Sequence, residues 1–366
     1  MKNRREISNR AKAHNPYLDY LRALSAIAVV LFHYTTRYNM LFGHVGDYPV
    51  YFSHGSYGVL VFFILSGYLT FKKYENIDRK KFLSGRFLRL YPVYWAALVI
   101  TMLLVVLFLP ERAVPTKDFL INFTMLQGFV GAKNVDAAYW TLYCELFFYV
   151  IIVLASYTKF RNRTLHLIVA ITILQFFVLL LSLSNHHLAV LLKKIVDSLY
   201  LHCFMIGGLF AVLEENIFKR YSFADEHESA TCTTKQLLNY GTIGVCYIYN
   251  CGQQYFSHEK ASGHFLLVSS ILCLVSIIAF RYWGGQFRVA KYLKPLIWIA
   301  GISYPIYLLH QNIGYIIIKE MESIGLINEL WLIVPITIII VMAYLLDRFI
   351  GKPTVVYYNK YWGKKN

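Results

Sequence analysis

The sequence predicts an all-α, polytopic integral membrane protein with about ten transmembrane helices and both termini in the cytoplasm. Of its 366 residues, 57% are hydrophobic and only 15% are charged, whereas soluble domains carry about 25% charged residues. A chain of this composition has too little polar surface to cover a globule in water. Two of its apolar runs, 90–109 and 164–184, also have the length of about 20 residues that crosses a bilayer.

The first four predicted helices carry most of the polar residues that matter for function. Helix one (17–37) follows a basic N-terminal stretch, and helix two (53–71) contains no lysine, arginine or carboxylate. Helix three (90–109) follows a loop rich in lysine and arginine, and helix four (139–157) contains one carboxylate. Each boundary is set where the apolar pattern gives way to charged or polar residues.

The remaining six predicted helices are apolar runs between charged or polar segments. No run repeats another, and we expect a single membrane domain over residues 1–366 without a fused extracellular domain. The six segments are 164–184, 196–213, 236–252, 263–280, 296–318 and 330–347.

The distribution of basic residues predicts the orientation of the helices. If both termini are cytoplasmic, 27 of the 36 lysines and arginines lie in cytoplasmic segments, eight lie outside, and Arg22 lies within helix one. This imbalance follows the positive-inside rule. The net charge of +16 is therefore a signal of membrane topology, and we expect no nucleic-acid partner.

Ionisable residues inside membrane helices are costly, which makes each a candidate for function. At about 1.5 Å per residue, His33 lies about 24 Å from the inner end of helix one, and His310 about 21 Å from that of helix nine. Glu145 lies roughly 9 Å below the outer end of helix four. All three fall in the outer half of a core about 30 Å thick. The sequence therefore predicts that they share one polar pocket.

These residue types suit acid–base catalysis. Arg22 and His33 are 11 residues apart and share one helix face. An imidazole can take a proton from a hydroxyl, and a carboxylate such as Glu145 can orient that imidazole. Structural alternatives stay open, because a membrane arginine can snorkel to headgroups and a histidine can bond between helices. His202 has no supporting motif and is expected to be structural.

Two arginines stand where the cytoplasmic loop meets helix three. The spacing of Arg86 and Arg89 places both guanidinium groups on one helix face. Two converging arginines suit a phosphate, because each planar fork can bind it with two hydrogen bonds. The alternative is that the pair only anchors the cytoplasmic end of the helix.

Five segments of the chain, taken together in the order given below, resemble motifs of the membrane-bound acyltransferase family 3. Members of this family are multi-span bacterial enzymes that O-acylate cell-envelope polysaccharides. Each motif alone is weak, but the five together are specific, and the resemblance covers about residues 15–350. One departure is that Asp347 does not directly precede Pro353, where the family often has an acidic residue before a proline. The segments are 18–33, 55–68, 86–92, 140–149 and 301–310.

The resemblance implies an acyl donor on the cytoplasmic side, usually acetyl-CoA, and a glycan acceptor presented from the outer side of the cell membrane. By motif position it marks Arg22 and His33 as the essential arginine and histidine. It marks Arg86 and Arg89 as a cytoplasmic arginine pair. Glu145 and His310 match polar positions that come later in the family's sequence pattern.

The sequence thus predicts an O-acyltransferase of the bacterial cytoplasmic membrane that uses acetyl-CoA as a substrate and has membrane lipids as neighbours. We expect no metal and no permanently bound cofactor. Two alternatives remain: a transporter or flippase of glycan intermediates, and the same fold transferring succinyl or a longer acyl group. The expected catalytic residues are His33, Glu145 and His310, and the expected donor-binding residues are Arg22, Arg86 and Arg89.

Overall fold

The computed structural model of the protein describes residues 15–46, 51–160, 163–183, 187–223, 234–257, 260–283, 294–326 and 328–361. These residues are 84% helical and contain no strand. The chain divides into two compact units, each described separately below. Unit 1 comprises residues 1–21, 60–77 and 144–294, and unit 2 comprises 22–59, 78–143 and 295–366.

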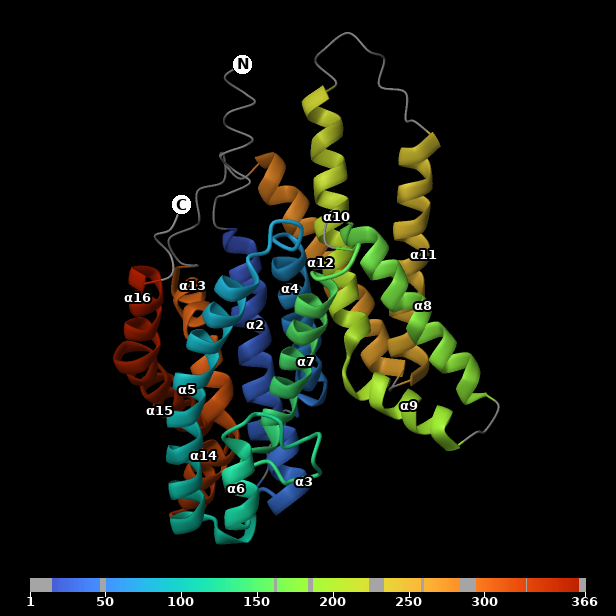
Figure 1. Ribbon diagram of the computed structural model, residues 1–366. Coiled ribbons are helices and arrows are strands. Elements are labelled where there is room, and N and C mark those ends of the chain that lie inside the picture. The colour runs from blue at the N-terminus through green and yellow to red at the C-terminus, as the bar shows by residue number, and fades with distance from the viewer. Residues whose placement is uncertain are drawn as a thin grey trace. The chain divides into compact units, whose positions relative to one another are not determined.

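Unit 2 is built around α14 (Ser303–Ser323), which packs against α5, α15 and two short helical turns, η1 and η4 (Figure 1). Most of α14 is buried, including three consecutive polar residues. The other elements that lie wholly or mainly in this unit are α2 (Pro16–Phe32), η1 (His33–Arg37), α3 (Tyr38–Phe42), η2 (Ser53–Tyr57), α5 (Arg79–Phe108), η3 (Pro110–Arg112), α6 (Thr116–Asn122), η4 (Ala137–Tyr139), α13 (Lys294–Gly301), η6 (Glu329–Leu332), α15 (Ile333–Leu346), η7 (Asp347–Gly351) and α16 (Lys352–Tyr361).

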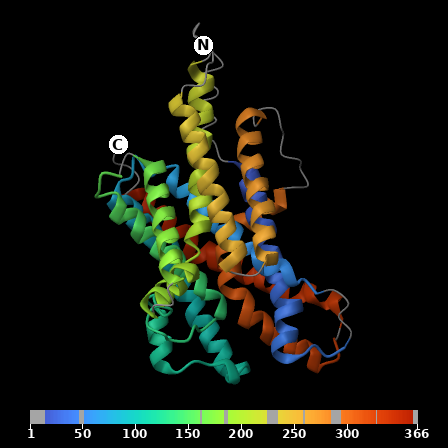
Figure 2. The same cartoon turned by 90° about the vertical axis from the view of Figure 1, so that its right-hand side faces the viewer.

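Unit 1 is built around α10 (Leu201–Phe223). Helices α10, α11 and α12 lie side by side (Figures 1 and 2). Glycines let α10 approach α4 closely, because a Cβ added at Gly207 would lie 2.0 Å from the carbonyl oxygen of Ile64. The other elements of this unit are α4 (Gly58–Phe71), α7 (Trp140–Ala155), α8 (Thr164–Ser182), α9 (His187–Ser198), α11 (Thr234–Ser257) and α12 (Lys260–Trp283).

Every predicted transmembrane segment falls on a helix of the structure. Six of these helices are long and apolar enough to span a membrane by length and composition, so the chain is a polytopic membrane protein. The larger count of about ten and the orientation of the termini stay predictions. The six candidate spans among the described residues are Ser53–Phe71, Arg79–Phe108, Ala137–Ala155, Thr164–Ser182, Lys260–Ile278 and Leu330–Tyr361.

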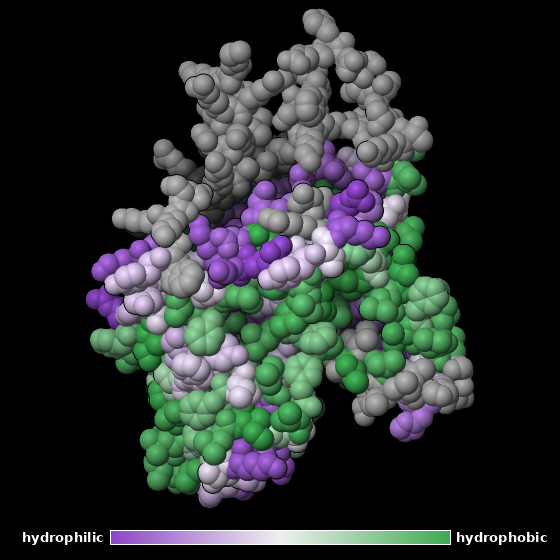
Figure 3. All heavy atoms as spheres, viewed as in Figure 1, coloured by the Kyte–Doolittle hydropathy of each residue, from purple (hydrophilic) through white to green (hydrophobic). Residues whose placement is uncertain are grey.

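Large apolar side chains are exposed along the outward faces of these helices, including Leu107 of α5, Leu174 of α8 and Leu272 of α12. Figure 3 shows this apolar surface, with hydrophilic residues gathered towards the ends of the helices. An exposed apolar surface of this extent suits contact with lipid tails rather than water.

The structure differs from the predicted helices in three places. Predicted helix nine is two helices, α13 and α14, separated at Ile302. The cause is Pro305, which has no N–H to bond the carbonyl of Gly301 four residues earlier. The segment before predicted helix six forms an additional helix, α9, which the apolar pattern does not predict. Within it, Lys193 pairs with Asp197 at 2.6 Å. Helix one widens into a π-helical turn that begins at His33.

Candidate active site

Helix α14 brings His310, Gln311 and Asn312 into the interior of unit 2, and all three are buried. A buried polar group costs free energy unless it is hydrogen-bonded. The partners of these side chains therefore define a polar site within the unit.

The structure brings His33 and His310 together. Their rings meet edge to face, with 4.8 Å between the ring centroids. His33 lies at the start of the π-helical turn η1. Such turns are rare in proteins overall, and many of those known occur at functional sites. The Nδ1 atom of His33 lies 2.8 Å from the hydroxyl of Tyr315. Two histidines from distant parts of the chain and one tyrosine thus form a compact cluster.

The backbone fixes the protonation pattern of neutral His310. Its Nδ1 lies 2.8 Å from the carbonyl oxygen of Tyr307. A carbonyl can only accept, so Nδ1 carries the proton and Nε2 carries the lone pair. That Nε2 atom is buried and has no hydrogen-bond partner among the described residues. Because buried polar atoms are nearly always bonded, this lone pair is a candidate contact for substrate.

Close packing holds His310 in place. The hydroxyl of Tyr34 donates a hydrogen bond of 2.9 Å to the backbone carbonyl of His310. Tyr34 is fully buried against α14. It fits there because residue 314 is glycine, where an added Cβ would lie 2.2 Å from the ring of Tyr34.

A second network connects the loops of unit 2 to this site. The Nε of Arg112 donates to Oδ1 of Asn312 at 2.8 Å, and its guanidinium lies 5.6 Å from the ring centroid of Tyr315. The amide of Asn312 donates in turn to the carbonyl of Val135. Arg112 therefore places a positive charge beside the tyrosine that contacts His33.

Asp136 anchors this network from the loop that precedes the candidate span Ala137–Ala155. Its two carboxylate oxygens accept from the backbone N–H groups of Ala138 and Asn312, both at 2.9 Å. Burial raises the pKa of Asp136 to about 6, although the two N–H donors and Arg112 act in the opposite direction. The carboxylate thus caps η4 and fixes the backbone of α14 next to His310.

His44 and Glu322 form a further buried pair in unit 2. Nδ1 of His44 lies 2.7 Å from a carboxylate oxygen of Glu322, and the hydroxyl of Tyr38 donates to the other oxygen at 2.9 Å. Nε2 of His44 donates to the carbonyl of Tyr34 at 2.9 Å. This bond satisfies a carbonyl within the π-helical turn, where the regular helical pattern is interrupted.

The three predicted donor-binding residues all lie in unit 2. Arg22 is half-buried on α2, 11 residues before His33 in the chain. Arg86 is half-buried on α5, with its guanidinium 5.2 Å from the ring centroid of Phe82, and Arg89 is exposed. Both lie on regular helix that begins with Asp78 as its N-cap, so the predicted i, i+3 spacing applies.

Glu145 lies in unit 1, on α7, and is half-buried. It accepts hydrogen bonds from Ser66, at 3.0 Å, and from the hydroxyl of Tyr149. The prediction that Glu145 shares a pocket with the two histidines stays a prediction. His202, expected to be structural, lies 2.5 Å from Gln254 in the buried interior of the same unit.

Sequence reasoning missed four residues of the site: Tyr315, Arg112, Asn312 and Asp136. Arg112 is one of the eight basic residues that the charge distribution predicts to lie outside, and nothing in the sequence links it to the histidines. Tyr315 follows His310 by five residues, a spacing that does not indicate a shared helix face. The backbone N–H of Asn312 donates to the carboxylate of Asp136, and no sequence pattern reveals such a contact.

The comparisons with known proteins agree with the geometry. A family model described as an acyltransferase domain, acyltransferase 3, matches residues 15–346 and so extends over both units. Over 108 residues the chain is 31% identical to the peptidoglycan O-acetyltransferase OatA of Listeria monocytogenes; the match covers 28% of this chain but only 15% of that protein. No solved structure matches the chain. The chain therefore belongs to the acyltransferase 3 family, and the family's acyltransferase domain covers residues 15–346.

Proposed function

We propose that this enzyme transfers an acetyl group from acetyl-CoA to a hydroxyl of a cell-envelope polysaccharide or lipid-linked glycan, in the bacterial cytoplasmic membrane. The observation that carries the proposal is the pairing of His33 with His310, whose buried Nε2 atom lacks a partner among the described residues. The relative OatA, a peptidoglycan O-acetyltransferase by name, supports a glycan acceptor.

His33 is the general base in this proposal. With the Tyr315 hydroxyl accepting from Nδ1–H, Nε2 of His33 carries the lone pair that takes the proton of the acceptor hydroxyl. The hydroxyl oxygen then attacks the thioester carbonyl carbon, the carbon–sulfur bond breaks, and the proton returns to the CoA thiolate. Nε2 of His310 accepts a hydrogen bond from substrate and helps to orient it.

The cationic residues bind the donor in this proposal. CoA carries several phosphates, and Arg86 and Arg89 offer two guanidinium groups on one face at the start of α5. Arg22 precedes His33 by 11 residues, on the face of α2 that the sequence predicts they share. Glu145 supports acid–base chemistry from α7. A Glu145→Gln variant keeps its size, so it is expected to fold and to lose activity.

The test is transfer in proteoliposomes that contain the purified chain, [14C]acetyl-CoA and an envelope glycan. We expect label on the glycan in an ester that mild base removes. Movement of unlabelled glycan across the bilayer without any transfer of label would identify a transporter and contradict the proposal.

A further inference from the structure

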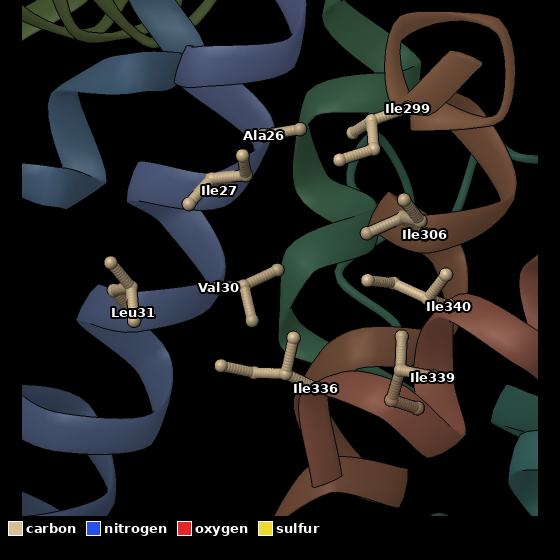
Figure 4. Close-up of a pocket in the computed structure, with 9 residues that line it drawn as sticks. All are labelled: Ala26, Ile27, Val30, Leu31, Ile299, Ile306, Ile336, Ile339 and Ile340. Carbon is tan, nitrogen blue, oxygen red and sulfur yellow. The ribbon is translucent and has the colours of Figure 1, made fainter. Parts of the chain in front are cut away.

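An apolar cavity of about 40 Å³ lies within unit 2, between α2, α13, α14 and α15 (Figure 4). Every side chain that lines it belongs to alanine, valine, leucine or isoleucine. Ala26 and Val30 line it from α2, Ile306 from α14, and Ile339 from α15. The cavity therefore offers a hydrocarbon surface and no hydrogen-bonding groups.

The cavity lies one helical turn before both histidines. Val30 precedes His33 by three residues, and Ile306 precedes His310 by four. Residues three or four apart lie on the same helix face, about 4.5–6 Å apart along the axis. Val30 and Ile306 therefore place two walls of the cavity within about one helical turn of His33 and His310.

The same face of α2 connects the cavity to Arg22. Ala26 and Val30 follow Arg22 by four and eight residues, spacings that keep them on one face at about 100° per residue. That face ends at His33. A donor whose phosphates lie towards Arg22 and whose carbonyl carbon lies at His33 thus passes Ala26 and Val30, two of the residues that line the cavity.

We propose that the cavity receives the hydrocarbon end of the donor's acyl group and sets the acyl length that the enzyme accepts. This inference rests on the proposed use of an acyl-CoA donor. The pantetheine arm is a poor occupant, because its two amides would lose their hydrogen bonds against aliphatic walls. A succinyl group is excluded for a stronger reason, since its terminal carboxylate would be buried without a partner.

The size of the cavity limits the acyl group to a few carbons. A space of about 10–15 Å³ by this measure holds one water-sized group. A cavity of about 40 Å³ therefore holds about three such groups beyond the carbonyl. Acetyl, propionyl and butyryl groups fit, and a hexanoyl group does not.

The test compares kcat/KM for acetyl-, butyryl-, hexanoyl- and succinyl-CoA in reconstituted protein. The wild type should accept the first two and discriminate against hexanoyl and succinyl donors by at least about tenfold. Ile306→Ala enlarges the cavity and should raise the hexanoyl-to-acetyl ratio by at least about tenfold. Ala26→Leu fills it and should lower the butyryl-to-acetyl ratio by a similar factor.

Ile338→Ala is the matched control, because Ile338 lies beside Ile339 on α15 but is exposed and does not line the cavity. Its donor ratios should equal those of the wild type. Ile306→Val provides a milder enlargement if the alanine variant unfolds, as reported by its melting temperature.

Opposite shifts in the enlarged and filled variants support the inference. Active, folded variants with unchanged donor ratios would overturn this inference but not the proposed function. They would mean that the cavity is a packing defect or is filled by lipid. A wild type that takes no acyl group from any CoA donor would overturn the proposed donor and this inference with it.

Discussion

His33 depends on a neighbour that orients its imidazole ring. The Tyr315 hydroxyl lies 2.8 Å from Nδ1, while the Tyr315 ring also packs near Arg112. Tyr315→Phe removes the hydroxyl and keeps the ring. A hydrogen bond worth about 1.4 kcal/mol corresponds to a factor of about ten.

We therefore expect Tyr315→Phe to lower kcat about tenfold, to leave the KM for the donor nearly unchanged, and to move the pH profile of kcat. A structural role alone predicts a lower melting temperature with an unaltered pH profile. That outcome would remove Tyr315 from the acid–base site.

Asp136 predicts a pH dependence of stability. Its pKa is about 6 in the folded protein, above the ordinary value of about 3.9 for an aspartate. The folded state thus binds more protons than the unfolded state between these values, and stability falls as the pH rises from about 4 to 6. The full effect is roughly 3 kcal/mol.

Asp136→Asn removes this titration and loses one of two backbone hydrogen bonds, because an amide has only one acceptor oxygen. Melting temperatures in detergent between pH 4 and 7 check this. The wild type should lose its stability advantage over the variant as the pH rises. Parallel curves for the two proteins would show that Asp136 does not titrate in this range.

Helix packing around α14 depends on the absence of a side chain at residue 314. Gly314→Ala places a Cβ 2.2 Å from the ring of Tyr34, which is fully buried and bonds the carbonyl of His310. Overpacking of this kind costs about 1–3 kcal/mol. We expect a lower melting temperature and lower activity.

Gly244→Ala in α11 is the control, since nothing lies within 4 Å of an added Cβ there and alanine favours helix over glycine. Its stability should stay the same or rise. Equal effects of the two substitutions would show that the contact between Tyr34 and α14 does not matter.

The first turns of α5 carry the proposed phosphate site. Arg86→Lys should already raise the KM for acetyl-CoA, because an ammonium group lacks the planar fork. Arg86→Ala and Arg89→Ala should raise it further while kcat and the KM for the acceptor change little, since the contacts are shared by ground and transition states. An unaltered donor KM with altered cysteine accessibility of the loops would make the pair a topological anchor.

Element by element, apolar length predicts helices well and their interruptions poorly. The bounds of the predicted helix 164–184 agree with those of α8 to within two residues. The break before α14 had a signal in Pro305, which the hydrophobic pattern concealed. The π-helical turn at His33 had no such signal in the sequence. The carbonyl of Tyr34 within this turn is bonded by His44, which lies ten residues later in the chain.

Across the whole molecule, depth arithmetic was sufficient to predict that His33 and His310 lie together, because both lie at a similar distance from the predicted cytoplasmic ends of helices one and nine. It could not predict Arg112 or Asp136, which reach the site from loops whose path depends on backbone hydrogen bonds. The same arithmetic placed Glu145 at a similar depth; its neighbours in the structure are Ser66 and Tyr149.

The rate of [14C]acetyl transfer in a His33→Ala variant measures whether His33 is the base in acyl transfer. His166→Ala is the matched control, because His166 is an exposed histidine on α8. We expect His33→Ala to fold and insert normally and to lose at least about 100-fold in rate, while His166→Ala keeps the wild-type rate. Near-normal transfer by a well-expressed His33→Ala protein would contradict it.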